Sequence, residues 1–238
     1  MNCRRLLSLA IAITVAAPAA AQGWHFVGTP YFMVPTMDGK AAVGPVEARV
    51  STSPSDIFSN LNWGIMGLFE VNNGRWGVNL DVSYMNLDVT DDRTLASING
   101  HQGAYAGTIL YRVHPYAELY AGARLNDIGA RLDINGPAGA RSASRNKSWV
   151  DPIIGVRAVL PVNDKLDLTV LADIGGFGVG SDHAAQFWPA LGIRLGARTK
   201  LMAGYRVIYT DYEDGAGSSR FVYDVLTYGP TIGFQTAF

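Results

Sequence analysis

The chain has 238 residues, of which 48% are hydrophobic and only 16% are charged, against roughly 25% charged residues in an ordinary soluble domain. Its formal net charge is −1, so no basic surface favours nucleic acid as a partner. After the first 21 residues the sequence contains no apolar run of about 18 residues, which excludes a protein that crosses the membrane with apolar helices.

Residues 1–21 have the pattern of a secretory signal peptide. A short basic region with Arg4 and Arg5 comes first, an apolar stretch follows from Leu6 to Ala17, and small residues come next. This apolar stretch is shorter than the ~20 residues that a spanning helix needs, so we expect cleavage near Ala21 rather than a membrane anchor.

The expected mature chain is a single β-barrel domain over residues 22–238. Its net charge is −3, because removal of two arginines leaves 17 basic residues against 20 acidic ones. The only cysteine, Cys3, leaves with the leader, which excludes disulfide bonds and thiolate chemistry in the mature protein.

The sequence after the leader alternates between apolar and polar residues, which is the side-chain period of a β-strand. In residues 76–84 the even positions are apolar and the odd positions are glycine, polar or acidic, and residues 117–126 and 150–160 repeat this behaviour. The polar face is rich in glycine, alanine, threonine and isolated charges of both signs, which is typical of a confined lumen and not of a soluble surface. We therefore expect the apolar face of each strand to contact lipid.

Aromatic residues gather near the ends of the expected strands, as in the two interfacial girdles of a membrane barrel. The predicted girdle residues are Trp24, Phe26, Trp63, Trp76, Tyr84, Tyr111, Tyr116, Trp149, Phe187, Trp188, Tyr209, Tyr212, Phe221 and Phe238.

The predicted fold is all-β, a closed antiparallel up-and-down transmembrane β-barrel of about ten strands, with eight or twelve strands as alternatives. Closure follows because an unpaired backbone group costs several kcal/mol in hydrocarbon. Short connections alternate with long ones, and Asn73-Gly74 is a strong hairpin signal. The expected strands are 24–37, 62–72, 75–89, 101–114, 116–134, 148–160, 165–175, 186–197, 200–212 and 220–238.

Two segments of the first long loop are less regular. Val43–Ser51 alternates weakly and either extends the first hairpin or belongs to a barrel with more strands. Asp56–Leu61 has the composition of a short helical turn, with Ser55 or Asp56 as its cap.

The leader, the ten alternating segments and the C-terminal strand 228–238 resemble the small outer-membrane β-barrel proteins of Gram-negative bacteria, of the OmpA-like and porin-like kind. Trp24, Thr29-Pro30-Tyr31 and Gly74–Gly77 resemble a largely uncharacterised proteobacterial branch, whose function is not established.

This resemblance implies a location in the bacterial outer membrane after export. It also implies an insertion signal for the barrel-assembly machinery, in which Thr231, Gly233 and Phe238 match the pattern and Thr236 departs from it.

The charges on the polar face are the most informative candidate site. They number six acids and five arginines, and a narrow, partly dry lumen favours their pairing across the barrel. Paired charges predict a closed structural barrel, whereas unpaired acidic and basic walls predict a narrow channel for small polar solutes. The predicted lumen charges are Glu70, Asp81, Arg112, Glu118, Arg124, Asp151, Arg157, Asp167, Asp173, Arg194 and Arg206.

An alternative function is an outer-rim membrane protease that activates water with carboxylates and a histidine. Asp91 and Asp92 lie in one expected outer loop, and Asp182 and His183 lie in another. Adjacent strand residues point to opposite faces, which weighs against such side-by-side pairs.

The remaining expectations follow from these patterns. The four histidines are scattered, so no metal site and no cofactor is predicted. The expected role is a non-enzymatic structural or surface barrel, or a narrow passive channel. The expected partners are outer-membrane lipid and the assembly machinery, and the protein is expected to be a monomer. A soluble lipocalin-like barrel is a further alternative.

Overall fold

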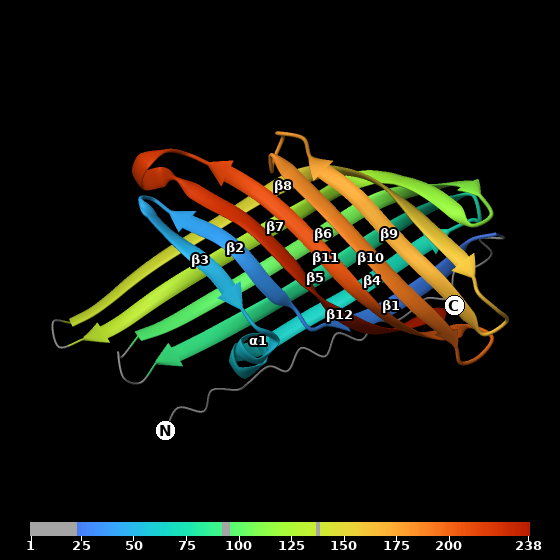
Figure 1. Cartoon of the computed structure of the whole chain (residues 1–238), viewed down its shortest axis with the longest axis horizontal. Coiled ribbons are helices and arrows are strands. Elements are labelled where there is room, and N and C mark those ends of the chain that lie inside the picture. The colour runs from blue at the N-terminus through green and yellow to red at the C-terminus, as the bar shows by residue number, and fades with distance from the viewer. Residues whose placement is uncertain (1–22, 92–95, 137–138) are drawn as a thin grey trace, which may run out of the picture.

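The computed structural model describes residues 23–91, 96–136 and 139–238, and it describes no side chains for 89–98, 130 and 132–143. Ten antiparallel strands form a closed barrel in the order β1, β4 to β12, and β12 pairs with β1 to complete the circle (Figure 1). The prediction of a ten-stranded closed antiparallel barrel is therefore confirmed.

The elements occur in the following chain order: β1 (His25–Met33), β2 (Thr36–Val43), β3 (Val46–Thr52), α1 (Pro54–Asn60), β4 (Leu61–Asn72), β5 (Trp76–Asp91), β6 (Ala96–His114), β7 (Ala117–Gly136), β8 (Gly139–Pro161), β9 (Leu166–Gly176), β10 (His183–Arg194), β11 (Thr199–Asp214), η1 (Gly217–Ser219) and β12 (Phe221–Ala237). We call the end of the barrel with the four short connections the turn end, and the opposite end the loop end. The strands β1 and β12 begin and finish the barrel at the turn end.

The predicted first strand, 24–37, is in fact two strands. It breaks at Val34 and Pro35, and β2 then continues along β12 from Thr36 to Val43. Pro35 has no N–H to donate to a ladder, which explains the break. Within the described residues β3 pairs with β2 alone, so Val43–Ser51 extends the first hairpin beyond the barrel wall.

Two predicted loops are partly strand instead. Residues 135–147 were expected to form a loop, but β7 and β8 stay paired as far as Gly136 opposite Gly139. The pairing of β5 with β6 likewise reaches Asp91 opposite Ala96. Residues 139–147 of β8 contain no aromatic residue and no aliphatic residue larger than alanine, so the alternation that identifies a membrane strand is absent from this extension.

The short helix α1 lies where a helical turn was expected, but its cap differs. Ser53 is the N-cap and accepts a hydrogen bond from the Asp56 backbone N–H (3.3 Å), while the Asp56 side chain accepts one from the Ser53 backbone N–H (2.9 Å). This capping box satisfies two free donors at the helix start. In the part of the chain that the structure describes, no helix has the length and apolar character to cross a membrane.

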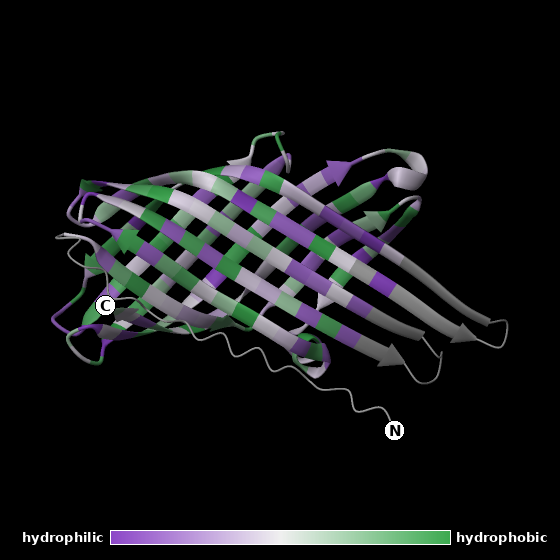
Figure 2. Cartoon of the chain, turned by 180° about the vertical axis from the view of Figure 1, so that it is seen from behind, coloured by the Kyte–Doolittle hydropathy of each residue, from purple (hydrophilic) through white to green (hydrophobic). Residues whose placement is uncertain are grey.

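The barrel has an apolar exterior and a polar interior. Val78, Leu80, Ile154 and Ile232 are about half exposed on the outer wall, whereas Asp167 is buried inside. Figure 2 shows the alternating apolar and polar residues along the strands. This distribution is the reverse of a soluble protein and matches a barrel with hydrocarbon around its wall.

Part of the predicted aromatic girdle is wrong. Trp63, Trp76 and Tyr116 are exposed, as a girdle requires. Four other predicted girdle residues are buried inside the barrel, because their sequence parity places them on the lumen face. These are Trp149, Trp188, Tyr212 and Phe221.

Candidate functional site: the barrel lumen

The first layer of lumen charges lies near the turn end and joins opposite walls. The guanidinium of Arg157 on β8 donates to Glu118 on the neighbouring β7 (Nε to Oε2, 2.7 Å) and to Glu70 on β4 (Nη2 to Oε1, 3.1 Å). The strands β8 and β4 are four positions apart in the barrel, so this pair spans the lumen. Arg112 completes the layer with a 2.9 Å ion pair to Glu118 and is partly exposed at the mouth.

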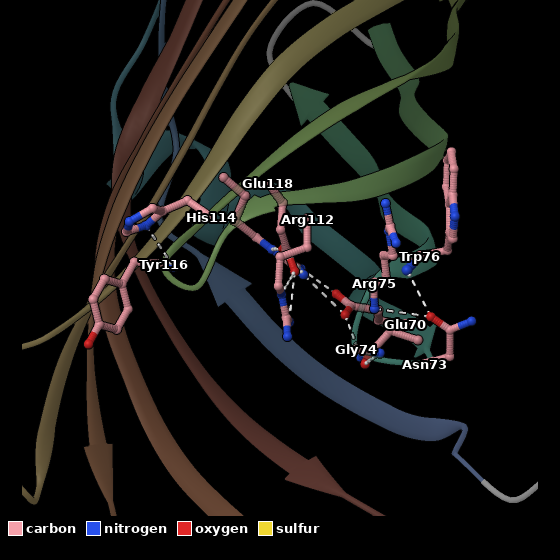
Figure 3. A network of polar contacts seen from close by, with 11 residues as sticks. Glu70, Asn73, Gly74, Arg75, Trp76, Arg112, His114, Tyr116 and Glu118 are labelled. Atoms are coloured by element: carbon pink, nitrogen blue, oxygen red, sulfur yellow. Dashed lines mark hydrogen bonds and ion pairs between the residues drawn. The ribbon is translucent and has the colours of Figure 1, made fainter.

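A hairpin turn sits beside this layer (Figure 3). The Asn73 side chain accepts hydrogen bonds from the backbone N–H groups of Arg75 (3.0 Å) and Trp76 (2.8 Å). Gly74 has a φ of +85°, a conformation that glycine adopts without a Cβ clash. The Asn73-Gly74 turn thus fixes the register of β4 against β5, and with it the position of Glu70 in the lumen.

The second layer centres on Arg206 of β11. Its guanidinium donates to Asp81 on β5 (2.6 Å), to the hydroxyl oxygen of Tyr31 on β1 (2.6 Å) and to Gln186 on β10 (2.9 Å). The Arg206 guanidinium also lies 4.6 Å from the ring centre of Trp188. Four strands therefore hold one buried cation at the middle of the barrel.

Gln186 links Arg206 to a second buried pair. Its amide nitrogen donates to Asp173 (2.9 Å), which also accepts from the Tyr120 hydroxyl (2.9 Å). Arg124 donates through Nη2 to both oxygens of Asp173, at 2.9 and 3.0 Å. Arg124 and Arg206 thus belong to one hydrogen-bonded network.

Asp151 differs from the other predicted lumen charges. It is 0% exposed, and among the side chains that the structure describes its hydrogen-bond donors are all neutral. These donors are Asn126 Nδ2 (2.7 Å), Trp149 Nε1 (3.2 Å) and both the backbone N–H (2.6 Å) and the hydroxyl (2.9 Å) of Ser181. The carboxylate therefore ties the β9–β10 loop to the barrel wall.

At the turn end, Asp167 pairs with Lys200 (2.6 Å) and lies 4.0 Å from the partly exposed Arg194. Lys200 was absent from the predicted set. It lies six residues before Arg206 on the same strand and therefore on the same face, so strict alternation along β11 identifies it.

The loop end of the lumen holds a buried cluster, three of whose residues were predicted to lie in the aromatic girdle. Trp149 on β8 stacks on Tyr212 of β11, with ring centres 4.0 Å apart and planes 12° apart. Phe221, Tyr223 and Val225 of β12 complete this buried group. We call these five residues the aromatic cluster.

The spaces beside the lumen charges are small. Cavities beside the Glu70–Arg157 pair, the Arg124–Arg206 network and the Asp81–Asp173 region measure about 60, 40 and 20 Å³. One water molecule occupies about 30 Å³ in the liquid, so these are gaps of molecular size and not a wide channel.

The three residues predicted as the insertion signal lie along the seam between β12 and β1. Thr231 accepts a hydrogen bond from Trp188 Nε1 (3.0 Å), and Gly233 stands opposite Tyr31. The Phe238 backbone N–H donates to the Phe26 carbonyl (2.9 Å), while its ring is exposed. Their role in membrane insertion stays a prediction.

Of the residues in the protease alternative, the side chain of Asp91 and all of Asp92 lie outside the described residues. The His183 side chain is 79% exposed and lies 3.7 Å from Asp211, whose pKa burial raises, with Asp224 and Asp182 adding to the effect. Among the described side chains, no group of three histidines, cysteines or acids is placed to hold a metal ion.

No family model and no curated protein matches the sequence. Among solved structures, the outer membrane protease OmpT of Escherichia coli is similar with a TM-score of 0.54 and 9% identity, covering 94% of this chain and 99% of that one. Ail, the attachment invasion locus protein of Yersinia pestis, is similar with a TM-score of 0.43 and 10% identity, covering 91% and 99%.

Neisserial surface protein A is also similar, with a TM-score of 0.32 and 12% identity, covering 92% of this chain and all of that one. The likeness to OmpT, at 9% identity, concerns the fold and carries no activity with it. The chain is thus a membrane β-barrel that shares its closed antiparallel fold with an outer membrane protein.

Proposed function

We propose that the protein is an outer-membrane barrel whose lumen is closed, acting as a structural or surface barrel and not as a passive channel. The observation that carries this proposal is the position of Arg157, whose guanidinium is hydrogen-bonded to Glu118 on its own side of the lumen and to Glu70 on the other. An ion that crosses the lumen has to pass this pair.

The energetics of buried charge support a permanent closure. Opening a path through the first layer separates Arg157 from at least one carboxylate in a site with little water. Removing one partner of a buried ion pair costs about 3–5 kcal/mol, so the open state is rarely populated. Further along the lumen, the side chains around Arg206 and the aromatic cluster also block the path of an ion.

The apolar exterior and the expected leader support a place in the bacterial outer membrane. Closed barrels satisfy every backbone donor and acceptor within hydrocarbon, and barrels of this kind are typical of outer membranes. The exported chain is proposed to insert through the assembly machinery with Thr231, Gly233 and Phe238 as its signal, and to stand there as a monomer.

Conductance in planar lipid bilayers tests this function. We expect the purified protein to insert without discrete current steps, and the Arg157→Ala variant to stay silent because the Arg206 layer and the aromatic cluster remain. The Arg49→Ala variant is the matched control, since Arg49 pairs with Asp38 at the exposed β2–β3 hairpin. Reproducible steps from the unsubstituted protein, with an ion selectivity that Arg157→Ala alters, contradict the proposal and favour the channel.

A further inference from the structure

The strands β1 and β4 are neighbours in the barrel wall but are paired over only part of their length. Their ladder runs from His25 opposite Asn72 to Pro30 opposite Gly67 and ends there. The strand β1 continues for three more residues against β12 alone, and β4 continues to Leu61 against β5 alone. The two strands therefore diverge above Pro30, and α1 lies over the gap that they leave.

A cavity of about 240 Å³ occupies this gap. Its lining includes residues from both faces of the wall. Phe32 and Ile65 are exposed on the outer face, whereas Met33 and Met85 are buried in the lumen. The cavity therefore joins the lipid-facing exterior to the loop-end half of the lumen.

The helix α1 forms one side of this cavity. Two α1 residues line the cavity. The side chain of Ile57 is buried, and the ring of Phe58 packs on Phe32 of β1 with ring centres 5.6 Å apart. The capping box at Ser53 fixes the helix start, so α1 is held as a short cover and not as an open loop.

The chemistry of the lining selects an apolar, flexible occupant. Met33, Met66 and Met85 line the cavity, and methionine is unbranched, so it adapts to irregular apolar shapes. An apolar cavity of about 150 Å³ in another protein stays dry and binds benzene, and this one is larger. At its inner end Met33 and Met85 also border the 40 Å³ gap beside Arg124.

The level of the cavity mouth identifies the occupant. Ile65 lies one outward position below Trp63, whose ring contacts Tyr84 with centres 4.6 Å apart, as in an interfacial girdle. The mouth is therefore at the edge of the hydrocarbon, where acyl chains are the most concentrated apolar molecules. The polar network of Arg124 and Arg206 ends the cavity, so it admits the end of a chain but gives no passage through the barrel.

We propose that the gap between β1 and β4 binds the end of a membrane-lipid acyl chain, which enters beneath α1 and reaches Met66 and Met85. This inference rests on the proposed membrane placement but not on the absence of conductance.

Photochemical cross-linking tests this site in vesicles of phosphatidylcholine that carries a diazirine near the end of one acyl chain. Irradiation releases N₂, and the resulting carbene inserts into a nearby C–H bond, so adducts mark direct contacts. We expect adducts on Ile57, Met66 and Met85 and none on Met202, which faces the lumen near the turn end. Adducts on the outward Phe69 and Ile232 show independently that the protein is in the bilayer.

A cavity-filling variant sharpens the test. Met66→Phe replaces an adaptable side chain with a rigid ring and leaves less room for a chain that enters, so we expect severalfold less adduct on Met85. Met202→Phe is the matched control and leaves that yield unchanged. The proposal is overturned if adducts form only on outward residues, or if the adduct on Met85 survives Met66→Phe undiminished. Loss of the outward adducts as well refutes the membrane placement instead.

Discussion

At the level of the apolar belt, the barrel lumen is filled by ion pairs such as Arg206 with Asp81; at the loop end, it is filled by the aromatic cluster around Trp149. The first region has lipid outside and charge inside, whereas the second has polar extensions outside and an apolar core inside. The change occurs within one strand, because Trp149 and Asp151 are two residues apart on the same face of β8 and are hydrogen-bonded to each other (3.2 Å). The contents of the lumen thus change together with the outer surface: the lumen is charged where the outer surface is apolar, and it is aromatic where the outer surface is polar.

The comparison predicts its largest effect in the charged region. Arg157→Ala leaves Glu70 and Glu118 without their shared cation, and we expect a loss of about 3–5 kcal/mol in unfolding free energy. Urea unfolding in lipid vesicles measures this loss. The exposed Arg49→Ala variant is the control and is expected to change stability by less than about 0.5 kcal/mol. Equal effects of the two substitutions contradict the account of the lumen.

A second effect comes from the outer wall. Leu80 lies midway between Trp76 and Tyr84 on the lipid face, so Leu80→Arg is expected to cost about 2–4 kcal/mol. Val46 is exposed on β3, beyond the barrel wall, and Val46→Arg is expected to be nearly neutral. The same unfolding measurement compares them. A neutral Leu80→Arg variant places water, and not lipid, around the belt.

A smaller effect is expected within the aromatic cluster. Tyr212→Leu retains most of the apolar volume but removes the stacking on Trp149, which is worth about 0.5–1.5 kcal/mol. Near-ultraviolet circular dichroism, together with unfolding, reports the change. A variant that loses several kcal/mol shows that the cluster depends on Tyr212 for more than ring packing.

The smallest effect is electrostatic and lies outside the membrane-spanning segments. The hydrogen bond and charge of Lys147 hold the pKa of Asp214 below its ordinary value. A lowered folded-state pKa gives stability above the unfolded value of about 3.9, and that stability is lost as the pH falls through the folded pKa. Carbon-13 NMR titration of the Asp214 carboxyl measures this pKa. Lys147→Met is expected to return it toward the ordinary value, and no change in the variant refutes the pairing.

The barrel was predictable because its strands in the lipid belt have one apolar face, and this period is visible in residues such as 76–84. The extension of β8 over residues 139–147 was not, since neither of its faces carries a large apolar residue. The burial of Trp149 and Tyr212 was missed because aromatic residues near strand ends were read as girdle, although their parity matched Asp151 and Arg206. An aromatic residue near a strand end can lie on either side of the wall. Its odd or even position along the strand decides which side it occupies.

The partners of the lumen charges were harder to predict. Alternation gives the face of a residue but not its height, and pairs such as Arg157 with Glu70 depend on the stagger of strands four positions apart. The neutral donors of Asp151 include Ser181, which a loop supplies, and no strand period reports such a residue. The gap between β1 and β4 likewise depends on pairing and not on composition.

Solid-state NMR of the protein in lipid bilayers tests the central claim most directly, through dipolar couplings between the labelled Arg157 guanidinium nitrogens and the carboxyl carbons of Glu70 and Glu118. The account predicts couplings of directly hydrogen-bonded pairs to both carboxylates and guanidinium hydrogens that exchange slowly with water. Absent couplings together with fast exchange would mean that water separates the two walls at this layer, which contradicts the account.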